Sequence, residues 1–243
     1  MQSQTSLGFK YLNYSRNKIG KHVYVPMPLN WLDAQSYCRN HFTELSFVNS
    51  QSDMEKLLKA GENKVGWIGL YCHPDNHTLW KWSGGGQYTY QAWGPGQPDN
   101  YQEDEDYAAI TDNRKWNDCF GIIKNHFYCI KVTVVKERKS WEEALKYCRD
   151  HQTDLPSVVS ETDRLVAQSE IIRHNDITGQ VWIGLRYLGG HWLWVNNDTL
   201  EYEAWPENNQ DQLCPVWNRC GALTKEGQWW AMDCLEKLNF ICI

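Results

Sequence analysis

The chain has 243 residues, which is enough for one large or two ordinary domains. Hydrophobic residues make up 42% of it and tryptophan alone occurs 14 times, so the composition supports a sizeable core and excludes a disordered chain. The net charge of -6, with no basic stripe, argues against nucleic acid and anionic membrane surfaces as partners. The apolar runs are too short for membrane insertion.

Nine cysteines are spread over both halves of the chain, which indicates an oxidising compartment. N-glycosylation acceptors at Asn13, Asn76 and Asn197 agree with this interpretation. We therefore expect a secreted or extracellular protein. The first twenty residues lack the apolar core of a secretory signal, so we expect the sequence to be a fragment or to begin at a misassigned start.

The first half of the chain is expected to open with a short strand and two helices. Asn30 can cap a helix that carries Cys38, and Ser52 precedes a second helical stretch that ends at Gly61. Short aromatic strands broken by Gly, Pro and Asn follow, and the three glycines at 84–86 are typical of a turn. Helices followed by a strand-rich half indicate an α+β fold.

The second half repeats this order. Ser140 with Glu143 has the spacing of a capping box before the helix that carries Cys148, and Ser160 with Asp163 suggests a second cap. Four segments recur in order, with offsets of 110 to 115 residues, which indicates a duplicated domain. The pairs are 31–38 with 141–148, 43–45 with 153–155, 67–70 with 182–185, and 127–130 with 240–243.

These repeats divide the chain into three parts. Residues 1–20 remain unassigned, residues 21–130 form the first domain, and residues 131–243 form the second. Because almost no linker separates the two domains, we expect them to sit close together with limited freedom.

Several motifs together resemble C-type lectin-like domains. They are Trp-Ile-Gly-Leu at 67–70, a cysteine in the first helix, Phe-x-Cys at the end, and Gln-Pro-Asp at 97–99 followed by Trp-Asn-Asp at 116–118. The resemblance covers residues 21–243, and the tandem arrangement is similar to units of the mannose-receptor-like proteins. It implies two α+β domains, each with two helices, antiparallel sheets and a long loop region.

The resemblance also implies a set of disulfides. The pairs that it implies are Cys38–Cys129, Cys148–Cys242 and Cys220–Cys234. In the first domain the places equivalent to the last pair hold Tyr107 and Gly121, so both halves of that bridge are absent together.

Three cysteines are left over. Cys72 and Cys119 either form a replacement bridge within the first domain or remain free thiols, and nothing in the sequence sets their distance. Cys214 has no implied partner. Because nine is an odd number, at least one thiol is free or pairs with another chain.

The segment 96–119 is rich in carboxylates and side-chain amides. Ca²⁺ prefers six to eight hard oxygen ligands and accepts amide carbonyls beside carboxylates. Five residues would offer such oxygens at intervals of 8, 20 and 21 from the first, which matches the spacing in the family: Gln97, Asp99, Glu105, Asn117 and Asp118. The alternative is a solvated acidic loop.

The resemblance further implies that Ca²⁺ is a cofactor for sugar binding. In the family a cis peptide before the proline, here Pro98, turns both flanking side chains toward the ion. The sugar-binding residues that it implies are Gln97, Asp99, Tyr101, Glu105 and Asn117. The order Gln-Pro-Asp goes with galactose-type sugars, so glycans or glycoproteins carrying galactose or N-acetylgalactosamine are the expected partners. The Tyr101 ring either covers the sugar or packs within the loop.

The second domain does not repeat this set. Counting back from Cys234, the Asn and Asp of the Trp-Asn-Asp motif fall on Trp230 and Ala231, which cannot coordinate calcium. The segment after Trp205 lacks Gln-Pro-Asp, and Glu207 and Asp233 are interpreted as surface acids. We expect this domain to be a scaffold or a protein-binding unit.

Other chemistry finds little support. Cys72, His73 and His77 suggest half of a zinc site, but a flexible polar loop is the favoured interpretation. The adjacent acids at 103–106 cannot flank a glycosidic bond from opposite sides, and no nucleophile elbow occurs. The sequence therefore predicts a calcium-dependent, non-enzymatic carbohydrate-binding protein. The alternative is a calcium-independent protein-binding module.

Overall fold

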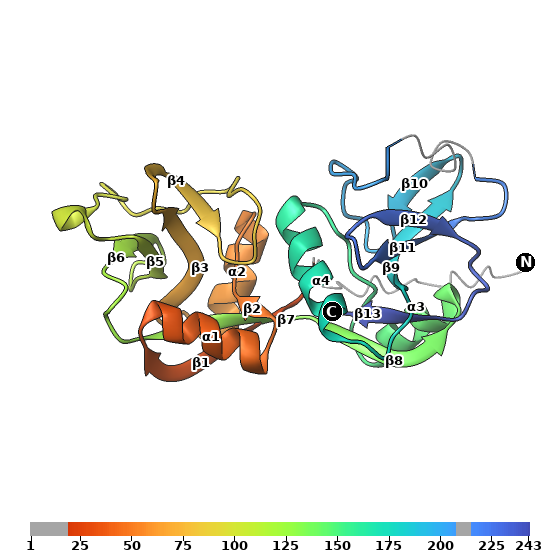
Figure 1. The fold of residues 1–243 in the computed structure, drawn as a ribbon, viewed down its shortest axis with the longest axis horizontal. Coiled ribbons are helices and arrows are strands. Elements are labelled where there is room, and N and C mark those ends of the chain that lie inside the picture. The colour runs from red at the N-terminus through yellow and green to blue at the C-terminus, as the bar shows by residue number, and fades with distance from the viewer. Residues whose placement is uncertain (1–18, 208–214) are drawn as a thin grey trace, which may run out of the picture.

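A computed structural model describes residues 19–207 and 215–243. Each half of the chain folds into two helices beside one sheet, and the two halves lie end to end (Figure 1). This arrangement confirms the predicted α+β fold and its duplication.

The first domain has the following elements: β1 (Lys21–Leu29), α1 (Trp31–His41), β2 (Glu44–Leu45), α2 (Gln51–Ala60), β3 (Gly66–His73), β4 (Asn76–Trp82), the 3-10 turn η1 (Tyr101–Glu103), β5 (Tyr107–Ile110), β6 (Trp116–Cys119) and β7 (Asn125–Lys131). Its sheet has the order β1-β7-β3-β5-β6, with β2 beside β7 and β4 beside β3.

The second domain repeats the pattern with β8 (Thr133–Lys139), α3 (Trp141–Asp150), α4 (Glu161–Arg173), β9 (Gln180–Leu188), β10 (His191–Trp194), β11 (Cys220–Thr224), β12 (Trp229–Met232) and β13 (Leu238–Cys242). Its sheet has the order β12-β11-β9-β13-β8, with β10 beside β9. In both domains the first and last strands pair with each other, so each domain begins and ends on the same side. Only Val132 separates β7 from β8.

The predicted helix caps are present with one exception. The Asn30 side chain accepts a hydrogen bond from the backbone of Asp33, and Ser140 and Glu143 form the full capping box. Helix α2 is capped by Ser50 rather than beginning after Ser52. The reason is that Asp53 makes two bonds at this end of the helix: its N–H donates to Ser50 Oγ, and its carboxylate accepts from the backbone N–H of Asn49.

Three disulfides join described residues. Cys38–Cys129 joins α1 to β7, Cys148–Cys242 joins α3 to β13, and Cys220–Cys234 pins β11 to the segment after β12. They are the pairs that the resemblance implied. Each long bridge therefore fastens the first helix of its domain to the closing strand.

An aromatic ring replaces the short bridge in the first domain. The equivalence is set by backbone bonds, because Trp31 N donates to Gly121 O at 3.0 Å just as Trp141 N donates to Cys234 O at 3.0 Å. A Cβ atom on Gly121 would lie 2.4 Å from the Tyr107 ring, so that ring fills the space of the missing disulfide. The absence of both cysteines is thus compensated by packing.

The left-over cysteines do not form a replacement bridge. Cys72 is buried and Cys119 is half-buried, and both are free thiols. Of the two alternatives that the sequence left open for this pair, free thiols are the one observed. Cys214 lies outside the described residues.

An equivalent cluster of tryptophan rings supports the long loop in each domain. Trp116 is fully buried, and its ring centroid lies 5.8 Å from that of Trp82 and 5.7 Å from that of Trp93. Trp229 contacts Trp194 and Trp205 in the same way, at 5.3 and 5.5 Å. The first residue of the Trp-Asn-Asp motif, and its counterpart Trp229, are therefore part of the core.

One histidine of β1, His22, is buried on the side of the strand that faces α2. His22 is 9% exposed, and its Nδ1 lies 2.9 Å from Ser46 Oγ. Burial lowers the pKa of His22 to about 4, with the charge of Lys56 acting in the same direction and that of Asp53 opposing it. His22 is therefore neutral in the folded protein at pH values where the unfolded chain would already bind a proton.

The stability of the first domain is expected to fall as the pH decreases from 6.5 to about 4. Over this range the unfolded chain gains a proton on His22 that the folded state does not accept, which costs roughly 3 kcal/mol of unfolding free energy. Urea denaturation at several pH values measures this loss. His22→Gln should abolish the decrease in this window, whereas His41→Gln at the exposed end of α1 should retain it. An unchanged decrease in His22→Gln would exclude His22 as its source.

Candidate calcium and carbohydrate site

The carboxylate of Asp118 lies at the centre of the candidate site. Side chains alternate along β6, so Trp116 and Asp118 point inward while Asn117 and Cys119 are half-buried. Asp118 is fully buried, and its two oxygens accept hydrogen bonds from the backbone N–H of Asp99 at 3.2 Å and of Asn100 at 2.7 Å. These bonds tie the long loop to the end of the sheet.

The loop itself is shaped by its own polar side chains. The Gln97–Pro98 peptide bond is cis, as the resemblance implied. Asn100 adopts the left-handed conformation at φ 46°, and its Oδ1 accepts from Glu105 N at 3.1 Å. Glu105 Oε2 in turn accepts from Tyr101 N at 3.1 Å. The 3-10 turn η1 is therefore closed by two bonds that aim the Glu105 carboxylate back toward the loop.

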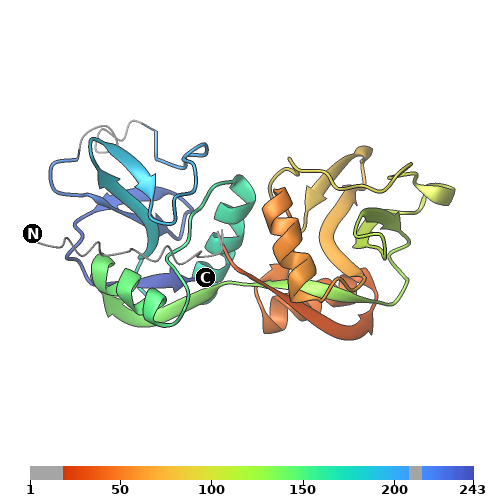
Figure 2. The ribbon, with the colours of Figure 1, turned by 180° about the vertical axis from the view of Figure 1, so that it is seen from behind.

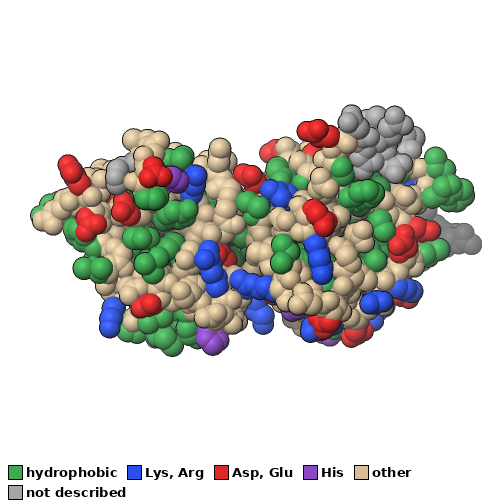
Figure 3. Space-filling view, in the orientation of Figure 1, with side chains coloured by type: hydrophobic (Ala, Val, Ile, Leu, Met, Phe, Trp, Pro, Cys, Tyr) green, Lys and Arg blue, Asp and Glu red, His purple; other side chains and the backbone are tan. Residues whose placement is uncertain are grey.

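Three of the five predicted calcium ligands come together. One carboxylate oxygen from each of Asp99, Glu105 and Asp118 lies within 4.8 Å of the other two. Figure 3 shows that acidic side chains gather at this end of the first domain. Among the described residues, none of the three carboxylates forms an ion pair with Lys, Arg or His.

The cluster concentrates negative charge. Burial raises the pKa of Glu105, the charges of Asp118 and Asp99 raise it further, and the hydrogen bond from Tyr101 opposes these effects. Like charges held this close repel one another unless a proton or a cation balances them. Hard carboxylate oxygens at this spacing suit Ca²⁺, so the residues present fit the ion that the resemblance implied.

The other two predicted ligands lie beside the cluster. Gln97 Oε1 accepts from the backbone of Asp99 at 3.2 Å. Asn117 Nδ2 donates to the carbonyl oxygen of Asp118 at 2.6 Å and lies 3.6 Å from Cys119 Sγ. Both amides are thus bonded to the backbone of residues whose carboxylates form the cluster.

Tyr101 is packed on one side and largely exposed. Its side chain is 60% exposed, and its ring contacts Phe120 edge-on at 6.4 Å. The ring thus packs on the segment after β6, while most of the side chain faces solvent. Loop packing therefore leaves an aromatic surface available to a ligand.

Asn100 is a residue that the sequence analysis did not include in the site. It contributes its backbone N–H to Asp118 and its side chain to Glu105, so it joins two of the clustered acids. The sequence feature that could have identified it is an Asn directly after Pro-Asp in a loop. Asn tolerates the left-handed conformation better than most residues.

The second domain carries different residues at the same place. The register pairs Ala109 with Asn117 in β5–β6 and Ala222 with Trp230 in β11–β12, so Trp230 occupies the place of Asn117. Ala231 likewise replaces Asp118. Within residues 131–207 and 215–243 no comparable carboxylate group forms, and Glu207 and Asp233 are exposed. The segment 208–214 of this loop lies outside the described residues.

Of the zinc half-site considered at 72–77, the side chains of Cys72 and His73 are described, whereas that of His77 lies outside the description. Cys72 is buried with its Sγ near the carbonyl oxygens of His73 and Asn76, while the His73 ring accepts from Asp75 N. In the part of the chain that the structure describes, the carboxylates of Asp99, Glu105 and Asp118 are the one group of three metal-ligating side chains. None of the described helices is long and apolar enough to cross a bilayer.

Known proteins resemble both halves of the chain. Residues 27–131 and 137–243 each match the family described as the lectin C-type domain. Lymphocyte antigen 75 of Homo sapiens is 26% identical over 88% of this chain, which spans 14% of that protein. Asialoglycoprotein receptor 2 of Mus musculus is 34% identical over 110 residues, or 42% of this chain and 36% of that protein.

Among solved structures, the mouse scavenger receptor C-type lectin carbohydrate-recognition domain is 29% identical, with a TM-score of 0.42, over 45% of this chain and 88% of that chain. The chain thus spans only a small part of the long relatives that it matches along most of its own length. Since two matches to one family cover most of its residues, the chain belongs to the C-type lectin domain family and carries two copies of that domain.

Proposed function

We propose that the first domain is a calcium-dependent carbohydrate-binding site. One Ca²⁺ would be held by five side chains: Gln97, Asp99, Glu105, Asn117 and Asp118. The observation that carries this proposal is the group of three carboxylates whose oxygens lie within 4.8 Å of one another, without a basic side chain paired to them among the described residues.

The ion, when bound, supplies coordination positions for two neighbouring sugar hydroxyls. The chain supplies the hydrogen bonds around it: carboxylates of Asp99 and Glu105 accept from the hydroxyls, whereas the amides of Gln97 and Asn117 can also donate. Which of these positions hold an amide and which hold an acid would select the geometry of the hydroxyl pair.

The sugar proposed for this order is galactose or N-acetylgalactosamine. Gln97 and Asp99 place an amide before the cis proline and an acid after it, which is the galactose-type order in this family. The exposed face of Tyr101 can cover the apolar side of such a sugar. The name of one relative, asialoglycoprotein receptor 2, agrees with a glycan or glycoprotein as partner.

The second domain is proposed to be a scaffold without a calcium site of its own. Trp230 and Ala231 offer no hard oxygen where Asn117 and Asp118 stand in the first domain. The protein as a whole is proposed to bind rather than catalyse. The three disulfides among its described residues favour an extracellular or secreted location.

Calorimetric titration of the full chain with Ca²⁺ tests this proposal. We expect one site with a dissociation constant of about 10⁻⁴ to 10⁻³ M, the range of extracellular calcium modules. The competing function is a calcium-independent protein-binding module. It would be favoured if no calcium were bound at millimolar concentration.

Exchanging the amide and the acid is expected to change the sugar preference. Gln97→Glu combined with Asp99→Asn keeps the number of oxygens and charges but reverses their order, so mannose should compete better than galactose while calcium binding persists. Competitive elution from a sugar column measures this. Glu103→Gln with Asp104→Asn, two exposed acids of the same loop, is the matched control and should leave the preference unchanged. A mannose preference in the unaltered chain would contradict the assignment.

A further inference from the structure

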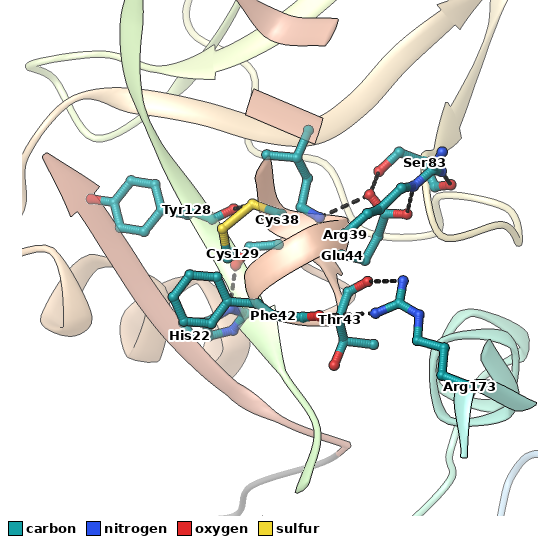
Figure 4. The surroundings of a disulfide bond; sticks show 12 residues. His22, Cys38, Arg39, Phe42, Thr43, Glu44, Ser83, Tyr128, Cys129 and Arg173 are labelled. Carbon is teal, nitrogen blue, oxygen red and sulfur yellow. Dashed lines mark hydrogen bonds and ion pairs between the residues drawn. A yellow bond between two sulfur atoms is a disulfide. The ribbon is translucent and has the colours of Figure 1, made fainter. Parts of the chain in front are cut away.

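Helix α4 of the second domain lies against the first domain. Both views of the ribbon place it between the two domains (Figures 1 and 2). At its start, Ser160 Oγ accepts a hydrogen bond from Asn49 Nδ2 at 3.1 Å. At its end, Arg173 donates to the carbonyl oxygens of Phe42 and Thr43, at 2.9 Å each (Figure 4). The contact therefore extends along the whole helix.

Between these polar ends the helix rests on the glycine turn at 84–86. A Cβ atom added to Gly84 would lie 2.7 Å from Val166 Cγ2, and one added to Gly85 would lie 2.6 Å from Leu165 Cδ1. The same addition at Gly86 would lie 2.5 Å from Thr162 Oγ1. At Gly84 the close approach of α4 thus leaves no room for a side chain, whereas Gly85 and Gly86 also have positive φ, at 93° and 83°, which favours glycine independently of the helix.

The contact depends on residues of α4 that its counterpart in the first domain, α2, does not share. With the caps Ser50 and Ser160 aligned, Thr162 and Val166 correspond to Ser52 and Lys56 of α2. The two α4 residues are buried, whereas Ser52 is exposed and Lys56 is only half-buried. One buried apolar cluster accordingly runs through both domains and includes Val132 and Val166.

Two packed tryptophans connect the glycine turn with the candidate site. The turn follows Trp82, whose carbonyl oxygen accepts from Gly85 N at 2.9 Å and whose ring packs on Trp116 at 5.8 Å. Trp116 is followed in β6 by Asn117 and Asp118. The turn is also fixed from the first domain, because Glu44 accepts from Ser83 Oγ at 2.9 Å (Figure 4).

We infer that α4 is a positioning element of the first domain's site. By packing against the glycine turn at 84–86, α4 holds Trp82 against Trp116. It thereby fixes the position of β6, the strand that carries Asn117 and Asp118. The second domain thus acts on the site of the first without touching the ligand. The effect on calcium rests on the proposed function, whereas the docking of α4 on the turn does not.

A pair of complementary substitutions in the full chain tests the docking. Gly84→Ala places a methyl group against Val166, and Val166→Ala removes the carbon that it meets. Hydrogen exchange followed by mass spectrometry should show about tenfold faster exchange at 83–93 and 116–119 in Gly84→Ala. Protection should return when both changes are combined. Additive effects without rescue, or no change at 116–119, would overturn the inference.

Calcium affinity distinguishes a positioning role from a merely structural contact, because a merely structural contact would leave the affinity unchanged. At 25 °C, well below unfolding, Gly84→Ala and Arg173→Ala should each weaken Ca²⁺ binding several-fold, and the double change at 84 and 166 should restore it. Arg149→Ala is the control, because Arg149 binds Asp154 and Val195 within its own domain. If the unaltered chain bound no calcium, the proposed function would fail while the exchange experiment would still decide the docking.

Discussion

Replacing Asp118 with alanine is expected to abolish the rise in thermal stability that calcium gives the unaltered chain. The side chain is fully buried, belongs to the carboxylate group and binds the backbone of Asp99 and Asn100. Only the folded state holds the ligands together, so calcium at a hundredfold excess over its dissociation constant should stabilise the unaltered protein by about 2.7 kcal/mol. Thermal unfolding with calcium and with chelator measures the difference.

Two further variants make this result interpretable. Asp118→Asn keeps the size and one accepting oxygen but removes the charge, so it should fold and still lose most of the calcium response. Asp104→Ala removes an exposed acid of the same loop and should respond to calcium as the unaltered chain does. A full calcium-dependent rise of the midpoint in Asp118→Ala would show that the ion, if bound, lies elsewhere.

Removing the Cys38–Cys129 disulfide is expected to have the largest effect on stability. The two cysteines are fully buried and 91 residues apart, so their bond restricts a long loop of the unfolded chain. Cys38→Ala with Cys129→Ala should lower the free energy of unfolding by roughly 2 to 5 kcal/mol. The Cys220–Cys234 bridge, which spans 14 residues, should contribute roughly 1 to 2 kcal/mol less on the chain-entropy account.

Equilibrium urea denaturation of both double variants gives the comparison. Cys119→Ala, which removes a half-buried free thiol, is the control for the loss of sulfur alone. Equal free energies of unfolding for the unaltered chain and the Cys38→Ala, Cys129→Ala variant would contradict a stabilising role for the bridge.

Local patterns predicted the architecture well. Caps such as Asn30 and Ser140 depend on neighbours three residues away, and the repeats at 31–38 and 141–148 depend only on the order of residues. Such features are set by short-range chemistry, which the sequence displays directly. The start of α2 was predicted two residues late because Ser50 and Ser52 both suit a cap, and the bond between Asp53 and Asn49 decides between them.

The sequence predicted which acids belong to the candidate site but not the hydrogen bonds that hold them in place. The spacing of Asp99, Glu105 and Asp118 indicated oxygen ligands, and the structure brings their carboxylates together. The part played by Asn100 depends on a left-handed backbone and on partners five and eighteen residues away, which spacing alone does not reveal. The three glycines at 84–86 were interpreted as a turn, which the positive φ of Gly85 and Gly86 confirms, whereas the close packing of α4 against them was not predicted.

Retention of the full chain on immobilised galactose, with calcium and then with chelator, tests the central claim most directly. We predict retention in millimolar calcium, release by chelator, and release by free galactose near 1 mM, the concentration that corresponds to roughly -4 kcal/mol for one sugar residue. Passage through the column in calcium, or retention that chelator does not reverse, would contradict a calcium-dependent galactose-type site in the first domain.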